Sequence, residues 1–187
     1  VEAQTEALSV DPQNRLHWRH NARRLTAEEI WDTFLLLQGD LNLEMFGEWV
    51  RPKMPEAVLA GSSQPHSVWR ETIGEAANRR AIYIHVKRSI QLPLLAAFDA
   101  PQRDATCPTR FATTVPTQAL SMLNSERVNK VAKAFADRVS AEHDDLVGQV
   151  EAAYEIALGR QADAGELELL FELCADLARE YEVDASS

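Results

Sequence analysis

Four stretches of this sequence place apolar residues at the three- and four-residue spacing of an α-helix, over residues 28–38, 126–139, 145–158 and 165–181. Residues that commonly begin or end a helix flank these stretches. They are Thr26 with Glu29, Asn124 with Ser125, Asp144 with Asp145, Asp163 with Glu166, Gly39 and Gly159. The sequence therefore predicts a mainly α fold: an irregular helical bundle with at most a small two-stranded β element and a long loop punctuated by Pro and Gly.

The region between the first two stretches carries shorter signals. Residues 81–86 are rich in β-branched and aromatic side chains, which predicts a strand, and residues 48–50 are the candidate partner strand. Residues 91–98 and 116–123 predict two short helices. Residues 40–70 show no lasting period, and a loop of this length is usually functional or mobile. The residues that punctuate it are Gly47, Pro52, Pro55, Gly61 and Pro65.

The long loop contains two Trp residues, Trp49 and Trp69. An exposed Trp can stack on a sugar ring or anchor a partner protein. The alternative, which we favour from the sequence, is that both indoles fold back into the core. A cleft that combined one of these Trp residues with an Arg and two carboxylates would favour a carbohydrate site.

The composition is that of an ordinary globular domain. The 187 residues are 45% hydrophobic and 26% charged, and no apolar run is long enough to cross a membrane. We expect a lead-in at residues 1–12, a single helical domain at 13–182 and a tail at 183–187. The domain has an N-terminal part at 13–100 and a helical C-terminal part at 101–182. Because the sequence starts without Met or a leader pattern, we expect it to be part of a longer protein.

The net charge of −10 is unevenly distributed along the chain. Residues 137–187 contain 3 Lys and Arg against 14 Asp and Glu, a net charge of 3 − 14 = −11, which leaves +1 for residues 1–136. An acidic surface argues against nucleic acid or an anionic membrane as the main partner.

Basic residues gather in two short segments, residues 14–24 and 79–88. We favour intramolecular pairing of these Arg side chains with carboxylates such as Glu28, Asp32 and Asp99, and the alternative is an anion or partner site. The residues predicted to form a binding site or a structural network are Trp18, Arg19, Asn21, Arg23, Arg24, Trp49, Trp69, Arg79, Arg80, Lys87, Arg88 and Arg110.

No motif predicts a catalytic residue, a cofactor or a metal ion. The glycine pattern of nucleotide-binding loops and the nucleophile elbow are both missing from the sequence. His17 and His20 could share one face of a short helix, but a zinc site needs further ligands. Cys174 falls on the apolar face of the last helical stretch and is predicted to be a buried thiol, whereas Cys107 lies in a Pro-flanked loop. A disulfide between them is left open for an oxidising compartment.

The last three helical stretches predict one shared core. Phe135, Val150, Leu170 and Phe171 occupy their apolar faces. Because short loops join successive stretches, we expect the helices to pack as neighbours and to bury these four side chains together.

Three blocks of the sequence, taken in order, resemble a known family. The first is Asn14-x-Leu16-x-Trp18-Arg19-x-Asn21-x-Arg23-Arg24-Leu25. The second is Arg79-Arg80-Ala81-Ile82-Tyr83 with Val86-Lys87-Arg88-Ser89. The third is Cys107-Pro108-x-Arg110 with Thr113-Thr114-Val115 and Leu123-Asn124-Ser125. Together they resemble the planctomycete cytochrome-c-associated C-terminal domain family, a domain of unknown function.

The resemblance covers nearly the whole chain. It implies a C-terminal part of large exported proteins that also carry a cytochrome-c-like region. It therefore implies an extracytoplasmic location, periplasmic or at the cell surface, and partners among the other domains of the same protein. It supplies no catalytic residue.

Two classes of function remain. We favour a non-catalytic interaction or scaffold module of a larger exported multidomain protein, with no cofactor. Its expected partners are the other domains of that protein, and a glycan or a further protein is also open; nucleic acid and direct membrane insertion are not expected. The alternative is a carbohydrate-binding or polysaccharide-processing domain that uses the Trp-bearing loop and the Arg-rich segments.

Overall fold

The computed structural model describes residues 2–61, 68–102 and 106–185, so Pro65 and the last two residues of the predicted tail lie outside it. Its helices are α1 (Glu2–Val10), α2 (Ala27–Gln38), α3 (Glu56–Leu59), the 3-10 helices η1 (Glu75–Asn78) and η2 (Ala81–Tyr83), α5 (Pro93–Ala97), α6 (Pro116–Leu123), α7 (Glu126–Glu142), α8 (Leu146–Leu158) and α9 (Ala164–Ala185). Helix makes up 54% of the structure and the described residues form no sheet, which confirms the mainly α prediction.

The helix ends form where the sequence indicated them. Thr26 Oγ1 accepts a hydrogen bond from the Glu29 N–H at 3.3 Å, and Glu29 Oε2 accepts one from the Thr26 N–H at 2.8 Å, which is a complete capping box. Gly39 and Gly159 end α2 and α8 at φ of 84° and 65°, a left-handed conformation that a Cβ atom disfavours. The remaining side-chain caps are Ser125 on α7, Asp145 on α8 and Asp163 with Glu166 on α9.

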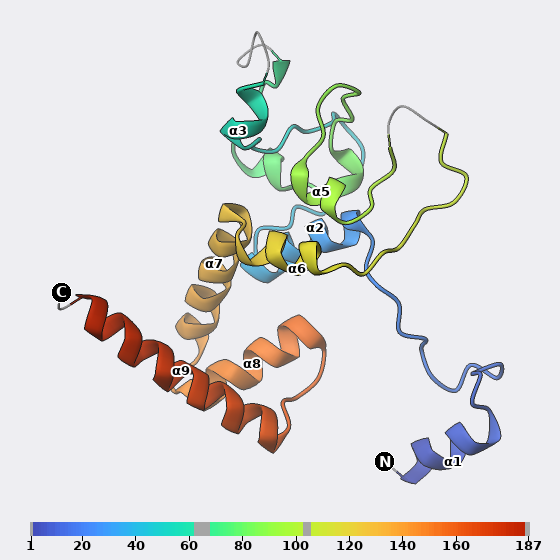
Figure 1. Ribbon diagram of the computed structural model, residues 1–187, viewed down its shortest axis with the longest axis vertical. Helices are drawn as coiled ribbons and strands as arrows, with labels where there is room; N and C mark the ends of the chain where they lie inside the picture. The colour runs from blue at the N-terminus through green and yellow to red at the C-terminus, as the bar shows by residue number, and fades with distance from the viewer. Residues whose placement is uncertain (1, 62–67, 103–105, 186–187) are drawn as a thin grey trace.

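The molecule consists of an upper body and a lower helical arm (Figure 1). The upper body surrounds α2, on which α5, η2 and α7 pack. From there α7 descends to α8 and α9, while an extended segment leads from α2 to α1 at the other side of the molecule (Figure 1). The main cluster of buried hydrophobic residues lies in the upper body and the first half of α7, and Val139 is buried farther along α7. The residues of the main cluster are Ala27, Ile30, Trp31, Phe34, Leu35, Val50, Met54, Trp69, Ala81, Ile84, Leu92, Leu95, Phe98 and Val131.

The prediction of a strand at residues 81–86 is wrong. The first three of these residues form η2, and Ile84 meets Val50 in an isolated bridge. Asp32 explains the difference, because its Oδ1 accepts the Ala81 N–H at 2.6 Å and holds the start of η2 against α2. The predicted partner segment is nevertheless in place, since the Val50 N–H donates to the Tyr83 carbonyl at 2.8 Å.

The core predicted for the last three helices is also wrong. Phe135, Val150, Leu170 and Phe171 are half-buried, and none of them belongs to the core of the upper body. The Cys174 thiol, predicted to be buried, is exposed. The exposure of Cys174 follows from the arrangement of the arm: α9 extends well beyond α8 (Figure 1), so its apolar face has no helix to pack on from the middle of α9 onward. Every residue of α9 from position 172 to position 181 is exposed.

Candidate functional site

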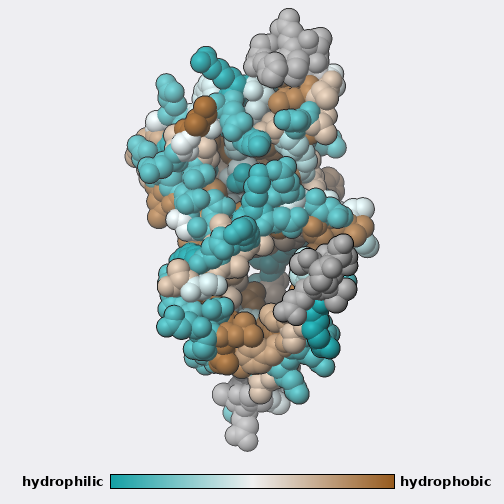
Figure 2. Space-filling model, turned by 90° about the vertical axis from the view of Figure 1, so that its left-hand side faces the viewer, coloured by the Kyte–Doolittle hydropathy of each residue, from teal (hydrophilic) through white to brown (hydrophobic). Residues whose placement is uncertain are grey.

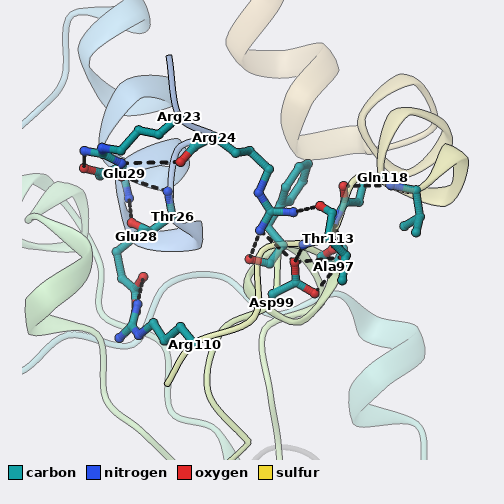
Figure 3. Close-up of polar contacts among 12 residues, drawn as sticks. Arg23, Arg24, Thr26, Glu28, Glu29, Ala97, Asp99, Arg110, Thr113 and Gln118 are labelled. Carbon is teal, nitrogen blue, oxygen red and sulfur yellow. Dashed lines mark hydrogen bonds and ion pairs between the residues drawn. The ribbon is translucent and has the colours of Figure 1, made fainter. Parts of the chain in front are cut away.

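Arg24 ties the start of α2 to the end of α5 and to the segment before α6. Its guanidinium lies 2.7 Å from Asp99 Oδ2 and donates to the carbonyl oxygens of Phe98, at 3.1 Å, and of Thr113 (Figure 3). The Thr113 N–H donates to the same carboxylate at 2.8 Å. This backbone bond, with the Thr113 hydroxyl and Arg24, holds the pKa of Asp99 below its usual value. The ionised Asp99 carboxylate therefore connects the end of α5, the start of α2 and the segment before α6.

Two further ion pairs join α2 to its neighbours. Arg80 Nε lies 3.1 Å from Asp32 Oδ2, and Arg110 Nη1 lies 2.7 Å from Glu28 Oε2 (Figure 3 shows the second pair). Both Arg side chains are nearly half exposed, so each pair contributes about 0–1 kcal/mol to stability. Together with the Arg24 contacts, they link α2 to η2, to the end of α5 and to the segment before α6. The pairing of these Arg side chains with Glu28, Asp32 and Asp99, which the sequence favoured, is therefore present.

Arg23 forms a local pair at the beginning of α2. Its two terminal nitrogens lie 2.8 Å and 2.5 Å from the Glu29 carboxylate oxygens (Figure 3). This contact and the Thr26 N–H lower the pKa of Glu29 to about 2. The carboxylate that completes the capping box is thus ionised through the whole physiological range.

Arg79 is the most deeply buried of the predicted Arg residues, at 5% exposure. Its guanidinium donates to the carbonyl oxygens of Glu44 at 3.1 Å, Glu48 at 2.5 Å and Phe46, and it stacks on the Tyr83 ring at 3.7 Å. Three loop carbonyls therefore converge on one cation. Arg79 shapes the loop that leads to Trp49.

The two Trp residues of the long loop lie in opposite environments. Trp69 is buried at 4% exposure, and its indole N–H donates to the Pro52 carbonyl at 2.8 Å, so the expected core position is confirmed. For Trp49 the same expectation is wrong, because 52% of this residue is exposed. The Val50 bridge holds Trp49 at the surface of the upper body.

Trp49 lines a hollow of about 380 Å³, which we call the Trp49 hollow. The Arg51 guanidinium carbon lies 4.2 Å from the Trp49 ring centroid, and the His85 ring lies 4.5 Å from it. The charged residues that line the hollow are Glu44, Glu48, Glu71, Arg51, Arg70 and Arg79. The hollow thus combines a Trp, Arg side chains and carboxylates, which is the combination expected of a carbohydrate site.

Lys87 and Arg88 lie in the turn that follows η2. Lys87 Nζ donates to the Val68 carbonyl at 2.6 Å, and Arg88 in the same turn is also engaged in a contact. Neither residue lines the Trp49 hollow. The structure therefore separates Lys87 and Arg88 from Arg79, although all three lie within ten residues of one another.

The segment at residues 14–24 forms turns and extended chain, so the short helix considered for it is wrong. The Asn14 side chain is buried and binds the Arg19 carbonyl at 2.6 Å and the Asn21 side chain at 2.9 Å. The Trp18 indole N–H donates to the Asp11 carbonyl at 2.9 Å. Trp18, Arg19 and Asn21 thus build a local hydrogen-bonded loop that lies apart from the other predicted residues.

No sequence motif singled out the carboxylates of the Trp49 hollow, nor Arg51 and Arg70. The available signal was the repeated Glu at positions 44 and 48 beside Trp49, in a segment without helical periodicity. Within the described ranges no group of His, Cys, Asp and Glu is arranged to hold a metal ion. In the same ranges no helix has the length and apolar character needed to span a membrane.

A family model described as PSD1, protein of unknown function (DUF1553), matches residues 1–174. The chain belongs to this family. The match confirms the domain of unknown function that the three sequence blocks indicated, and it includes the upper body, α8 and the first half of α9. The planctomycete origin and the cytochrome-c association remain what the resemblance implies. No curated protein and no solved structure matches the chain.

Proposed function

We propose that the chain is a non-catalytic interaction module of a larger exported protein, and that α9 docks on another domain of that protein. The observation that carries this proposal is the exposed apolar stripe of α9. Its members follow one another at intervals of four residues and are Leu169, Leu173, Leu177 and Tyr181. Hydrophobic residues on the surface of the lower half of the molecule are visible in Figure 2.

An acidic stripe runs beside the apolar one. Its members are Glu168, Glu172, Asp176 and Glu180, each one residue before an apolar member. Residues four apart on a helix lie on the same face, so the two stripes are parallel along α9. A helix with such a face is typical of helix-in-groove recognition, in which apolar anchors enter a groove and charges at its edge set the partner. The partner domain is therefore expected to offer an apolar groove edged by Lys or Arg.

The experiment measures binding of the chain to the neighbouring domains of its full-length protein by isothermal titration calorimetry. The Leu173→Glu/Leu177→Glu variant is expected to weaken binding at least about tenfold, because it places two charges in the apolar contact. Its helical content, measured by circular dichroism, should equal that of the parent, since both side chains are exposed.

Leu43→Glu is the matched control, because Leu43 is an exposed Leu of the upper body. It should leave binding unchanged. Equal binding by the α9 variant and the parent would contradict the proposal. So would a dimer of the isolated chain that the α9 variant abolishes, because the partner would then be a second copy.

The Trp49 hollow favours a second candidate function, binding of a carbohydrate. Half-exposed Trp49 can stack on a sugar ring, and the Arg and Glu side chains around it can hydrogen-bond hydroxyl groups. Chitohexaose and a chondroitin sulfate hexasaccharide are suitable neutral and anionic probes. If the hollow is the site, Trp49→Ala loses binding at least about tenfold, by about 1.4 kcal/mol or more, while Trp18→Ala binds as the parent does. Equal loss in both variants, or no binding of either glycan to the parent, would exclude this function.

A further inference from the structure

A pocket of about 490 Å³ lies where α7 begins, beside the end of α2. Its lining differs from that of the Trp49 hollow and contains mostly cations and amides. The polar residues that form it include Gln38, Lys53, Asn78, Asn124, Arg127 and Lys130. Pro55 and Val131 add apolar wall.

Arg127 is a half-buried cation without a counterion. Within the described part of the chain it forms no ion pair and no hydrogen bond, and its Nε is buried without an acceptor. Its guanidinium carbon lies 3.7 Å from the ring centroid of Trp31, whose indole N–H is also buried without an acceptor. Two neighbouring N–H donors thus lack the partner that buried polar groups normally have.

The position of Arg127 in α7 is also unfavourable for a cation. It is the second residue of α7, where the positive end of the helix dipole disfavours a cation. Burial lowers the pKa of the Arg127 guanidinium to about 10, so the side chain remains charged at neutral pH. The stacking on Trp31 offsets part of this cost. A bound anion would offset the rest.

The other charged groups leave the pocket positive. Lys130 Nζ lies 2.5 Å from Glu126 Oε1, and Lys130 and Lys53 together lower the pKa of the Glu126 carboxyl. Three cations, Arg127, Lys53 and Lys130, therefore face one carboxylate, Glu126, which is largely exposed. The local net charge is 3 − 1 = +2.

We propose that this pocket binds a phosphate or sulfate group. The guanidinium fork of Arg127 and the ammonium groups of Lys53 and Lys130 suit a tetrahedral oxyanion, and the first N–H groups of α7 add donors of the same sign. The pocket is much larger than one such ion. The amides of Gln38, Asn78 and Asn124 therefore have room to bind hydroxyl groups of an ester, such as a sugar phosphate or sugar sulfate.

The test titrates the chain, at constant ionic strength, with inorganic phosphate, inorganic sulfate, glucose 6-phosphate and glucose 6-sulfate, followed by calorimetry. Saturable binding of at least one oxyanion is expected, with glucose as the neutral control. Tighter binding of an ester than of its free ion identifies the ester as the ligand class. Arg127→Met, which keeps an apolar contact with Trp31, should lower the association constant at least about tenfold.

Lys53→Met is the second variant, because Lys53 is exposed and its loss leaves the packing on Trp31 intact. It should also weaken binding. Lys133→Met is the matched control, since Lys133 lies on α7 outside the pocket and pairs with Asp137. The proposal is overturned if none of the four phosphate and sulfate ligands binds saturably. It is also overturned if succinate, a carboxylate anion, binds as tightly as phosphate and sulfate, or if Lys133→Met weakens binding as much as Lys53→Met.

Discussion

Replacing Leu35 with alanine is expected to lower the free energy of unfolding by about 2–5 kcal/mol. Leu35 has no exposed surface and lies at the centre of the upper body, on the face of α2 that packs against α7 and α5. Removing its side chain loses buried apolar contact and leaves a cavity that the rigid surroundings cannot fill. Urea unfolding followed by circular dichroism measures the change.

Leu36→Ala is the matched control, because it makes the same chemical change one position along α2, where 52% of the residue is exposed. We expect it to cost less than about 1 kcal/mol, as is usual for surface substitutions. Similar losses for the two variants would show that the face of α2 that packs into the core is not the one described above.

Replacing Arg79 with methionine is expected to cost about 3–5 kcal/mol, the range found when one partner of a buried charged contact is removed. The carbonyls of Glu44, Phe46 and Glu48 would lose the cation that they share, and methionine offers no donor in its place. The loop that presents Trp49 should loosen as well. Urea unfolding measures the loss, and amide hydrogen exchange across the loop locates it.

Arg80→Met is the control for this variant, because Arg80 is the next residue and forms an exposed ion pair with Asp32. It should cost at most about 1 kcal/mol. Arg79→Lys should recover part of the loss, since an ammonium can donate to the carbonyls but lacks the planar stack on Tyr83. Equal stability of the Arg79→Met and Arg80→Met variants would contradict the anchoring role of Arg79.

The beginnings and ends of the main helices were predictable because they depend on neighbours within four residues. The Thr26 and Glu29 capping box needs two side chains three positions apart, and both bonds form. Gly39 ends α2 for an equally local reason, its positive φ. The family was also predictable, because each of the three short blocks can be recognised in the sequence alone.

The candidate sites were only partly predictable, because they depend on segments that meet across the fold. The sequence indicated Trp49 and several Arg residues as candidates for a binding site or a structural network. It did not indicate that Glu71 and Arg70 would join Glu48 around one hollow. Nor did it single out Arg127, whose significance lies in its stacking on Trp31 and in the carboxylate that it lacks. Distances between residues far apart in the chain have no local signature.

The sequence by itself determined the helical class, the helix ends and the amphipathic face of each long helix. Tertiary structure decided which of those faces are buried. The apolar residues of α2 and α9 show the same spacing, yet Leu35 is fully enclosed and Leu173 is half exposed. Spacing requires only that apolar residues share a face, and burial requires a second surface opposite it. For α2 that surface is α5, η2 and α7, whereas α9 extends past the helices that could cover it.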